Sequence, residues 1–163
     1  MEHIFKPIGA VLVMLCCYLA SFSISSKAKK EADELEAFIL LMRKIRAEIS
    51  CFSRPLCEIY AGFESEVFER SGFIKALKEN GLDYALDTAG DKLSLREENF
   101  AVLKQFAMAI GKNYRDEEIK TCDYYISQLS ERHKAHRDAI PKNNKLSRSL
   151  CFLFGISIII ILI

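Results

Sequence analysis

The amino-acid sequence predicts an all-α protein, in which an antiparallel bundle of five to six helices is flanked by an N-terminal and a C-terminal transmembrane helix. Three observations support this fold class. Uncharged apolar runs occupy both extremities of the chain, apolar residues between them recur every three or four positions, and little of the chain shows the alternation that is typical of β-strands. With 163 residues, the chain is long enough for one ordinary domain.

The charge balance excludes two classes of protein. The chain has 23 Lys and Arg residues against 22 Asp and Glu residues, and 50% of its residues are hydrophobic. A nucleic-acid-binding protein would show a basic excess, and a disordered chain would have fewer apolar residues and a larger net charge. We therefore expect a folded protein that binds no nucleic acid.

Residues 7–26 are predicted to form the first transmembrane helix. No charged residue lies between Lys6 and Lys27, and a helix of about 20 residues is about 30 Å long, which matches the hydrocarbon core of a bilayer. A cleaved signal peptide is the alternative. It requires positive charge before the apolar run, whereas here Lys6 is opposed by Glu2 and the larger positive charge follows the run.

Residues 147–163 are predicted to form a second transmembrane helix or a membrane tail. The apolar run from Leu150 to Ile163 is short for a complete span, but Lys145 and Arg148 can extend their charged groups to the lipid headgroups. A buried strand or a core helix is the alternative for this segment.

Basic residues predict the orientation of both membrane segments. They follow the first segment and precede the second, so both groups face the middle of the chain, and the positive-inside rule places residues 27–145 in the cytoplasm. The residues concerned are Lys27, Lys29, Lys30, Lys142, Lys145 and Arg148.

Residues 27–145 are predicted to form the helical bundle. The first helix has apolar residues three and four positions apart, which is typical of a helix–helix contact, and Pro55 ends it. Further helices are expected at 55–72, 73–79 and 82–89, because glycines lie at their ends. The contact positions of the first helix are Leu35, Phe38, Met42, Ile45, Ile49 and Phe52.

Two later helices are predicted from capping signals. Ser94 and Glu97 have the spacing of a capping box, and Gly111 occupies the position of a left-handed cap at the end of the helix that they open. Asn113 is expected to cap the last and longest helix, which Pro141 ends. If the first and last helices are antiparallel, the two membrane segments lie at the same end of the bundle.

The sequence offers little that indicates chemistry. Cys51, Cys57 and Cys122 lack the C-x-x-C spacing of metal or redox pairs. His133 and His136 are three positions apart without an obvious third ligand, and we interpret them as a polar continuation of a helix contact. The alternative is a membrane-tethered metal or thiol sensor that uses these histidines and cysteines. Phosphate-binding glycine loops and hydrolase motifs are absent, so we expect no enzyme, cofactor, bound metal or small-molecule substrate.

Short motifs occur in a particular order along the chain. They are Glu48-Ile49, the aromatic-x-x-Pro-Leu-x-Glu segment Phe52–Glu58, the glycine-containing helix boundary Phe106–Tyr114, the pair Asn144-Lys145 and an apolar tail with Gly155. In this order, with a membrane segment at each end, the chain resembles the stage III sporulation protein AB family. It departs from the family pattern at Asn113-Tyr114 in place of Ser-Asp, Glu118 in place of Gln, and Cys151 in place of Gly.

The resemblance implies a role in endospore formation. Members of this family belong to a channel between mother cell and forespore, and are similar to the inner-membrane platform proteins of type II secretion and type IV pilus machines. The implied partners are channel proteins of the same operon and a cytoplasmic secretion-type ATPase, at the mother-cell membrane facing the forespore. The family-motif residues become candidates for partner contact: Glu48, Pro55, Leu56, Glu58, Gly111, Asn113 and Asp116.

Overall fold

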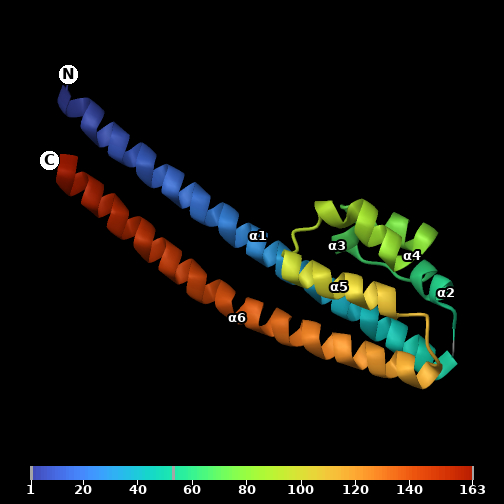
Figure 1. The fold of residues 1–163 in the computed structure, drawn as a ribbon. Helices are drawn as coiled ribbons and strands as arrows, with labels where there is room; N and C mark the ends of the chain where they lie inside the picture. Colours follow the sequence, from blue (N-terminus) through green and yellow to red (C-terminus); the bar gives the residue numbers. More distant parts are fainter. Residues whose placement is uncertain (1, 53, 163) are drawn as a thin grey trace. The chain divides into compact units, whose positions relative to one another are not determined.

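The computed structural model describes the backbone of residues 2–52 and 54–162, and the side chains of residues 23, 26–52, 54–140, 149 and 153. The described backbone is helical and contains no strand, which confirms the all-α prediction. Its helices are α1 (Glu2–Phe52), α2 (Leu56–Ala61), α3 (Glu66–Glu69), α4 (Phe73–Ala89), the short 3₁₀ helix η1 (Gly90–Lys92), α5 (Glu97–Ala109) and α6 (Arg115–Leu162), as Figure 1 shows.

The chain divides into two compact units. The bundle unit, Lys30–Ala135, contains α2 to α5 together with parts of α1 and α6. The terminal unit, Met1–Lys29 with His136–Ile163, contains the remaining parts of α1 and α6, which run antiparallel, so that the start of α1 and the end of α6 lie at the same end of this unit (Figure 1). Within the terminal unit, His136 Nε2 donates a hydrogen bond to the carbonyl oxygen of Ala28, at 3.0 Å.

Both predicted membrane segments, residues 7–26 and 147–163, fall almost entirely on side chains outside the described set. Among the residues that the structure does describe, no helix contains a stretch that is both long enough and apolar enough to cross a bilayer. The two transmembrane helices therefore stay predictions.

The predicted contact face of α1 forms the centre of the bundle unit. Its positions are buried from Leu35 to Ile49, including Phe38, Met42 and Ile45, which confirms the three-and-four spacing as a buried face. The prediction is wrong for its last position, because Phe52 is 66% exposed. Phe52 is the final residue of α1, where no further turn of helix follows to carry the packing.

Three phenylalanines attach the short helices to α1. Phe38 of α1, Phe68 of α3 and Phe73 of α4 are completely buried, and their ring centroids are 4.5, 5.2 and 4.9 Å apart in the three pairs. Distances and tilted orientations of this kind are favourable for aromatic pairs. The four-residue helix α3 is thus held by the packing of its apolar side chains, Phe68 above all, because an isolated helix of that length has negligible stability.

Charged and aromatic contacts join α5 to its neighbours. The Lys104 ammonium of α5 bonds to two carboxylates of α4, with 3.2 Å to Asp83 Oδ1 and a shorter contact to Asp87. On the other side, the Phe106 ring packs edge-on against Tyr125 of α6, at 5.5 Å between centroids. The antiparallel prediction for the long helices also holds within this unit, where Arg46 of α1 pairs with Asp123 of α6.

The single helix predicted at 55–72 is wrong, because the structure has two helices there. Gly62 ends α2, its N–H bonding to the carbonyl of Glu58 at 3.2 Å, and its own carbonyl accepts a hydrogen bond from the Lys44 ammonium of α1. With φ −88° and ψ 7°, the backbone of Gly62 leaves the helical conformation. The chain then turns to bury Phe63 before α3 begins.

The boundary predicted near residue 80 is confirmed as a break inside α4. Gly81 has φ 86° and ψ −179°, which separates the segments 73–79 and 82–89. By contrast, the helix end predicted at Pro141 is wrong, because the backbone of α6 stays helical through this residue. A proline inside a helix removes one main-chain hydrogen bond and crowds the carbonyl four residues earlier, yet α6 continues to Leu162.

Two buried carboxylates of α1 hold the loop that leads into α5. Glu31 and Glu34 are 5% and 1% exposed. Glu34 Oε2 accepts a hydrogen bond from the backbone N–H of Ser94 at 2.6 Å, and Glu31 Oε1 accepts from the backbone N–H of Arg96 at 3.3 Å and from the Asn99 side chain at 3.1 Å. The start of α5 is therefore bound by side chains of another helix.

The capping box predicted at Ser94 is consequently wrong. The residue before the first turn of α5 is Arg96, whose carbonyl accepts the N–H groups of Asn99 and Phe100. Ser94 lies two residues too early, and its own N–H is already bound by Glu34. The carboxylates of Glu31 and Glu34, rather than the Ser94 side chain, bind the backbone at this point.

Burial of Glu34 predicts a specific pH dependence of stability. Burial raises the pKa of Glu34 above its ordinary value of 4.5, although the Ser94 N–H and the nearby Lys30 partly oppose this shift. A raised pKa means that the folded protein binds this proton more readily than the unfolded chain. The contribution of Glu34 to the free energy of unfolding therefore rises as pH falls from neutral towards 4.5, and it levels off below that value.

Glu34→Gln should remove this dependence, because glutamine keeps an acceptor for Ser94 and does not ionise. Urea unfolding, followed by circular dichroism at several pH values, measures it. The unfolding free energy of the wild type minus that of E34Q should increase as pH falls from 7 to 4.5. The other carboxyl groups are common to both proteins and cancel, so a difference that is independent of pH contradicts the assignment.

Candidate partner-contact site

The structure brings the two family-motif segments together at one end of the bundle unit. Leu56, at the start of α2, lies against Gly111, in the turn between α5 and α6, so closely that a Cβ at Gly111 would lie 2.8 Å from Leu56 Cδ1. We call this end the junction, and define it as residues 48–58, without Ser53, and residues 111–117. The sequence offered no indication that these segments meet.

Gly111 is required here for two reasons. Its φ of +83° lies in the left-handed region that residues with a side chain rarely adopt, and the space where a Cβ would project is taken by Leu56. The prediction of a left-handed cap at this position is confirmed.

The buried carboxylate of Glu118 binds the backbone of this turn by hydrogen bonds. Glu118 of α6 is 4% exposed. Its Oε2 accepts a hydrogen bond from the backbone N–H of Gly111 at 3.0 Å, and its Oε1 accepts from Lys112 at 2.9 Å and from Asn113 at 2.8 Å. Three consecutive N–H groups directed at one carboxylate form a strong, charge-assisted arrangement.

The cap predicted at Asn113 is wrong, because α6 begins one residue later than predicted. The first turn of α6 is closed at Tyr114, whose carbonyl accepts the N–H groups of Glu117 and Glu118 at 3.0 and 2.9 Å. Asn113 precedes that position, and its backbone N–H is bound by Glu118. A carboxylate has two oxygens that can both accept, which allows Glu118 to serve three donors.

Further contacts fasten the end of α1 to the start of α6. The Arg115 guanidinium donates a hydrogen bond to the carbonyl of Ser50. One turn away, Arg46 binds Asp123 with two nitrogens, the Nη2–Oδ2 distance being 3.1 Å. Glu48 Oε2 lies 3.4 Å from Arg54 Nη1, so the chain is held on both sides of the α1–α2 connection.

The seven predicted site residues divide into supporting and exposed groups. Glu48 and Leu56 are half-buried and make the contacts described above, and Gly111 shapes the turn. Pro55 precedes α2, and its carbonyl accepts the N–H groups of Glu58 and Ile59 at 3.1 and 3.3 Å. The side chains that are exposed, and thus available to a partner, belong to Pro55, Glu58, Asn113 and Asp116.

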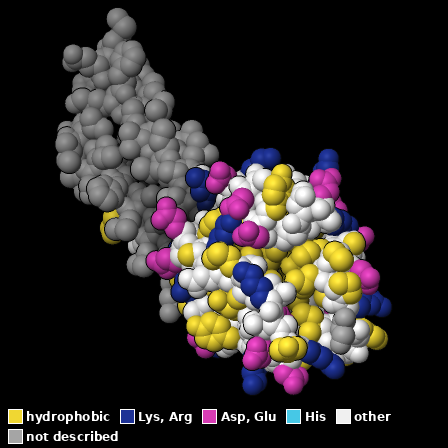
Figure 2. Space-filling model, turned by 45° about the vertical axis from the view of Figure 1, so that its right-hand side comes forward, with side chains coloured by type: hydrophobic (Ala, Val, Ile, Leu, Met, Phe, Trp, Pro, Cys, Tyr) yellow, Lys and Arg dark blue, Asp and Glu magenta, His cyan; other side chains and the backbone are white. Residues whose placement is uncertain are grey.

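Two exposed aromatic residues also belong to the junction, and they were not identified from the sequence as surface residues. Tyr114 is 88% exposed and Phe52 is 66% exposed, and the Arg54 guanidinium carbon lies 5.1 Å from the centre of the Phe52 ring. Figure 2 turns this side of the molecule forward and shows hydrophobic side chains reaching the surface between acidic and basic ones. Exposed aromatic rings beside charged groups are typical of protein–protein contact surfaces.

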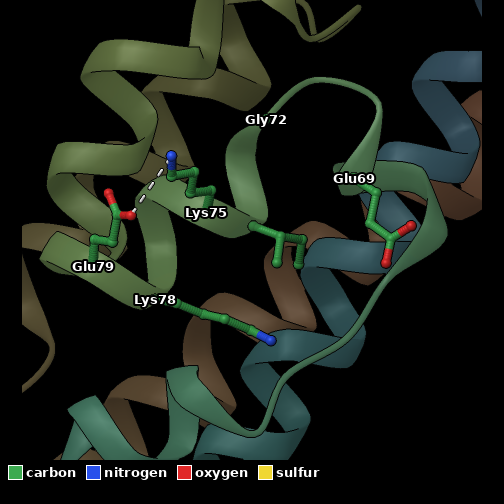
Figure 3. Close-up of a pocket in the computed structure, with 6 residues that line it drawn as sticks. Glu69, Gly72, Lys75, Lys78 and Glu79 are labelled. Atoms are coloured by element: carbon green, nitrogen blue, oxygen red, sulfur yellow. Dashed lines mark ion pairs between the residues drawn. The ribbon is translucent and has the colours of Figure 1, made fainter.

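A shallow hollow lies between α3 and α4 (Figure 3). Its volume is about 410 Å³, and Lys75 and Glu79 on its margin point toward each other, 4.0 Å apart. Two lysines and two glutamates give no preference for the charge of a ligand. The lining residues are Glu69, Gly72, Ile74, Lys75, Lys78 and Glu79.

The described part of the chain gives no support to a metal or thiol sensor. No group of three His, Cys, Asp or Glu side chains within it could hold a metal ion. Cys51 and Cys57 are free and exposed. Cys122 is buried, and burial, together with the nearby Glu118 and Asp123 charges, raises the pKa of its thiol to about 12, which makes it unreactive.

Gly111→Ala tests the contact between the two segments. A left-handed alanine should lower the free energy of unfolding by about 1–2 kcal/mol, and displacement of Leu56 should add about 1 kcal/mol. Gly72→Ala is the matched control, because Gly72 also has a positive φ, of +76°, but nothing lies within 4 Å of its Cβ position. Chemical denaturation of both variants measures the difference.

A double-mutant cycle with Leu56→Ala isolates the steric part. The excess loss of G111A over G72A should disappear when Leu56 is truncated. Equal losses in G111A and G72A, or an excess that persists without the Leu56 side chain, would show that the two segments are not in contact.

Comparison with known proteins gives the family. The profile of the stage III sporulation protein AB family matches residues 6–163. Stage III sporulation protein AB of Bacillus subtilis (strain 168) is 23% identical over 172 residues, which cover 96% of this chain and 98% of that protein. No solved structure matches the chain. Because the family profile covers almost the entire sequence, the chain belongs to the stage III sporulation protein AB family.

Proposed function

We propose that this protein is a non-enzymatic membrane platform that links components of the mother cell–forespore channel to a cytoplasmic secretion-type ATPase. The family to which it belongs is one of stage III sporulation proteins, which supports a role in sporulation. Residues 7–26 and 147–163 anchor the chain in the mother-cell membrane that faces the forespore. The helical domain, residues 27–145, lies on the cytoplasmic side.

The observation that carries this proposal is the junction. Two motif segments from distant parts of the chain meet there through Leu56 and Gly111, and Glu118 holds the backbone of the turn from the buried side. A surface that is rigid before binding loses less conformational entropy on association. An adaptor between a channel and a motor needs such a surface.

The exposed chemistry of the junction is suited to a protein partner. Glu58 and Lys112 present opposite charges, and Phe52 and Tyr114 present exposed rings beside them. Charged residues at the rim of an interface set partner selection and the rate of association, whereas aromatic residues contribute much of the affinity. The ATPase encoded in the same operon is the partner that we assign to this surface.

Charge reversal at the junction tests the assignment. Glu58→Lys combined with Lys112→Glu keeps the net charge and should weaken binding of the operon's ATPase by about tenfold or more in a quantitative pull-down. Glu64→Lys with Lys92→Glu is the matched control, since both residues are exposed and lie outside the junction. The control should bind as the wild type does.

Circular dichroism and thermal unfolding establish that both double variants are folded. Sporulation efficiency of cells carrying each variant gives a second readout, which should fall with the junction variant alone. Full ATPase binding and normal sporulation by a folded junction variant would remove this surface from the proposed function.

A further inference from the structure

We propose that the terminal unit carries a binding site for anionic phospholipid headgroups, formed by basic residues of α1 and α6. This inference rests on the membrane attachment proposed above. The residues of this site are Lys27 and Lys29 of α1 and Arg137 of α6.

The first step of the argument is the local charge. In the sequence, residues 23–29 and 136–149 contain six basic residues, among them Lys27, Lys29 and Arg137, and one acidic residue, Asp138, although the whole chain is almost neutral with 23 basic and 22 acidic residues. The basic residues are therefore separated from the acidic ones. Lys27 and Lys29 directly follow the uncharged run 7–26 of α1, at the level where lipid headgroups would lie.

The second step is proximity. The hydrogen bond from His136 Nε2 to the carbonyl of Ala28, at 3.0 Å, fixes the two helices against each other at this level. Ala28 lies between Lys27 and Lys29 in the sequence, and His136 is followed by Arg137. Lys27 and Lys29 of α1 and Arg137 of α6 therefore lie at the same level of the helix pair.

The third step is that no acidic side chain described in the structure pairs with these basic residues. Lys27, Lys29 and Arg137 are exposed, and among the side chains that the structure describes none forms an ion pair with them. By contrast, Lys30, the next residue in the bundle unit, is paired with Glu34 at 3.7 Å. Lys27, Lys29 and Arg137 are therefore available for phosphate groups outside the protein.

The fourth step is the class of ligand. Each Lys or Arg at an anionic membrane surface increases binding by roughly fivefold, and the effect decays within a Debye length. Exposed, mobile ammonium groups bind phosphate as point charges and make no demand on the shape of the ligand. We therefore assign the headgroups of anionic phospholipids in the bilayer, and not a soluble phosphate compound.

The full-length protein, reconstituted in phosphatidylcholine vesicles that contain phosphatidylglycerol, tests this proposal. Spin-labelled phosphatidylglycerol and phosphatidylcholine report which lipid is motionally restricted at the protein surface. We expect at least about a twofold preference for phosphatidylglycerol, which decreases as sodium chloride is added. Lys27→Gln with Lys29→Gln should reduce the preference, whereas Lys78→Gln with Lys92→Gln, which removes the same charge from the bundle unit, should not.

The outcomes separate this proposal from the proposed function. Restricted lipid of both kinds without any preference, or a preference unaffected by the Lys27 and Lys29 substitutions, overturns the headgroup site and leaves membrane attachment intact. Protein that does not float with vesicles of either composition contradicts the attachment itself. Loss of the preference on adding glycerol phosphate, but not sodium chloride of the same ionic strength, shows a site for free phosphate and also overturns the proposal.

Discussion

The bundle depends on buried carboxylates that bind backbone N–H groups at both ends of α5. Glu31 and Glu34 of α1 bind the loop before this helix, and Glu118 of α6 binds the turn after it. Unpaired backbone N–H groups and unpaired carboxylates are each costly to bury. Because each satisfies the other here, irregular loops can pack closely against the long helices.

This arrangement connects the core of the protein to its surface. The long helices contribute acceptors from their buried faces, and Phe38 of α1 contributes the aromatic contact that holds α3 and α4. The shorter helices are therefore attached to the long helices as well as to one another. At the junction, hydrogen bonds from Glu118 likewise hold the backbone that carries the exposed side chains that we assign to a partner. Those exposed side chains are not needed for these hydrogen bonds.

Periodic burial could be predicted from the sequence, whereas contacts from distant residues could not. The spacing of Leu35 to Ile49 reflects one buried face of a helix, and Gly111 reflects a local backbone conformation, so both were recognisable. Ser94 and Asn113 looked like caps because local rules treat the nearest polar side chain as the acceptor. In the structure the two helices begin later, after Arg96 and Tyr114. The backbone N–H groups of Ser94 and Asn113 are bound by Glu34 and Glu118, contacts that cannot be recognised without the fold. The contact of Leu56 with Gly111 is hidden for the same reason.

Amide hydrogen exchange at the turn tests most directly whether Glu118 organises the junction. Glu118→Ala should accelerate exchange of the backbone N–H groups of Lys112 and Asn113 by about tenfold or more relative to amides in the middle of α5, because their acceptor is removed. Glu117→Ala, at the exposed neighbouring position, should leave these amides as slow as in the wild type. Equally slow exchange at Lys112 and Asn113 with and without the Glu118 carboxylate would contradict the role that we give it.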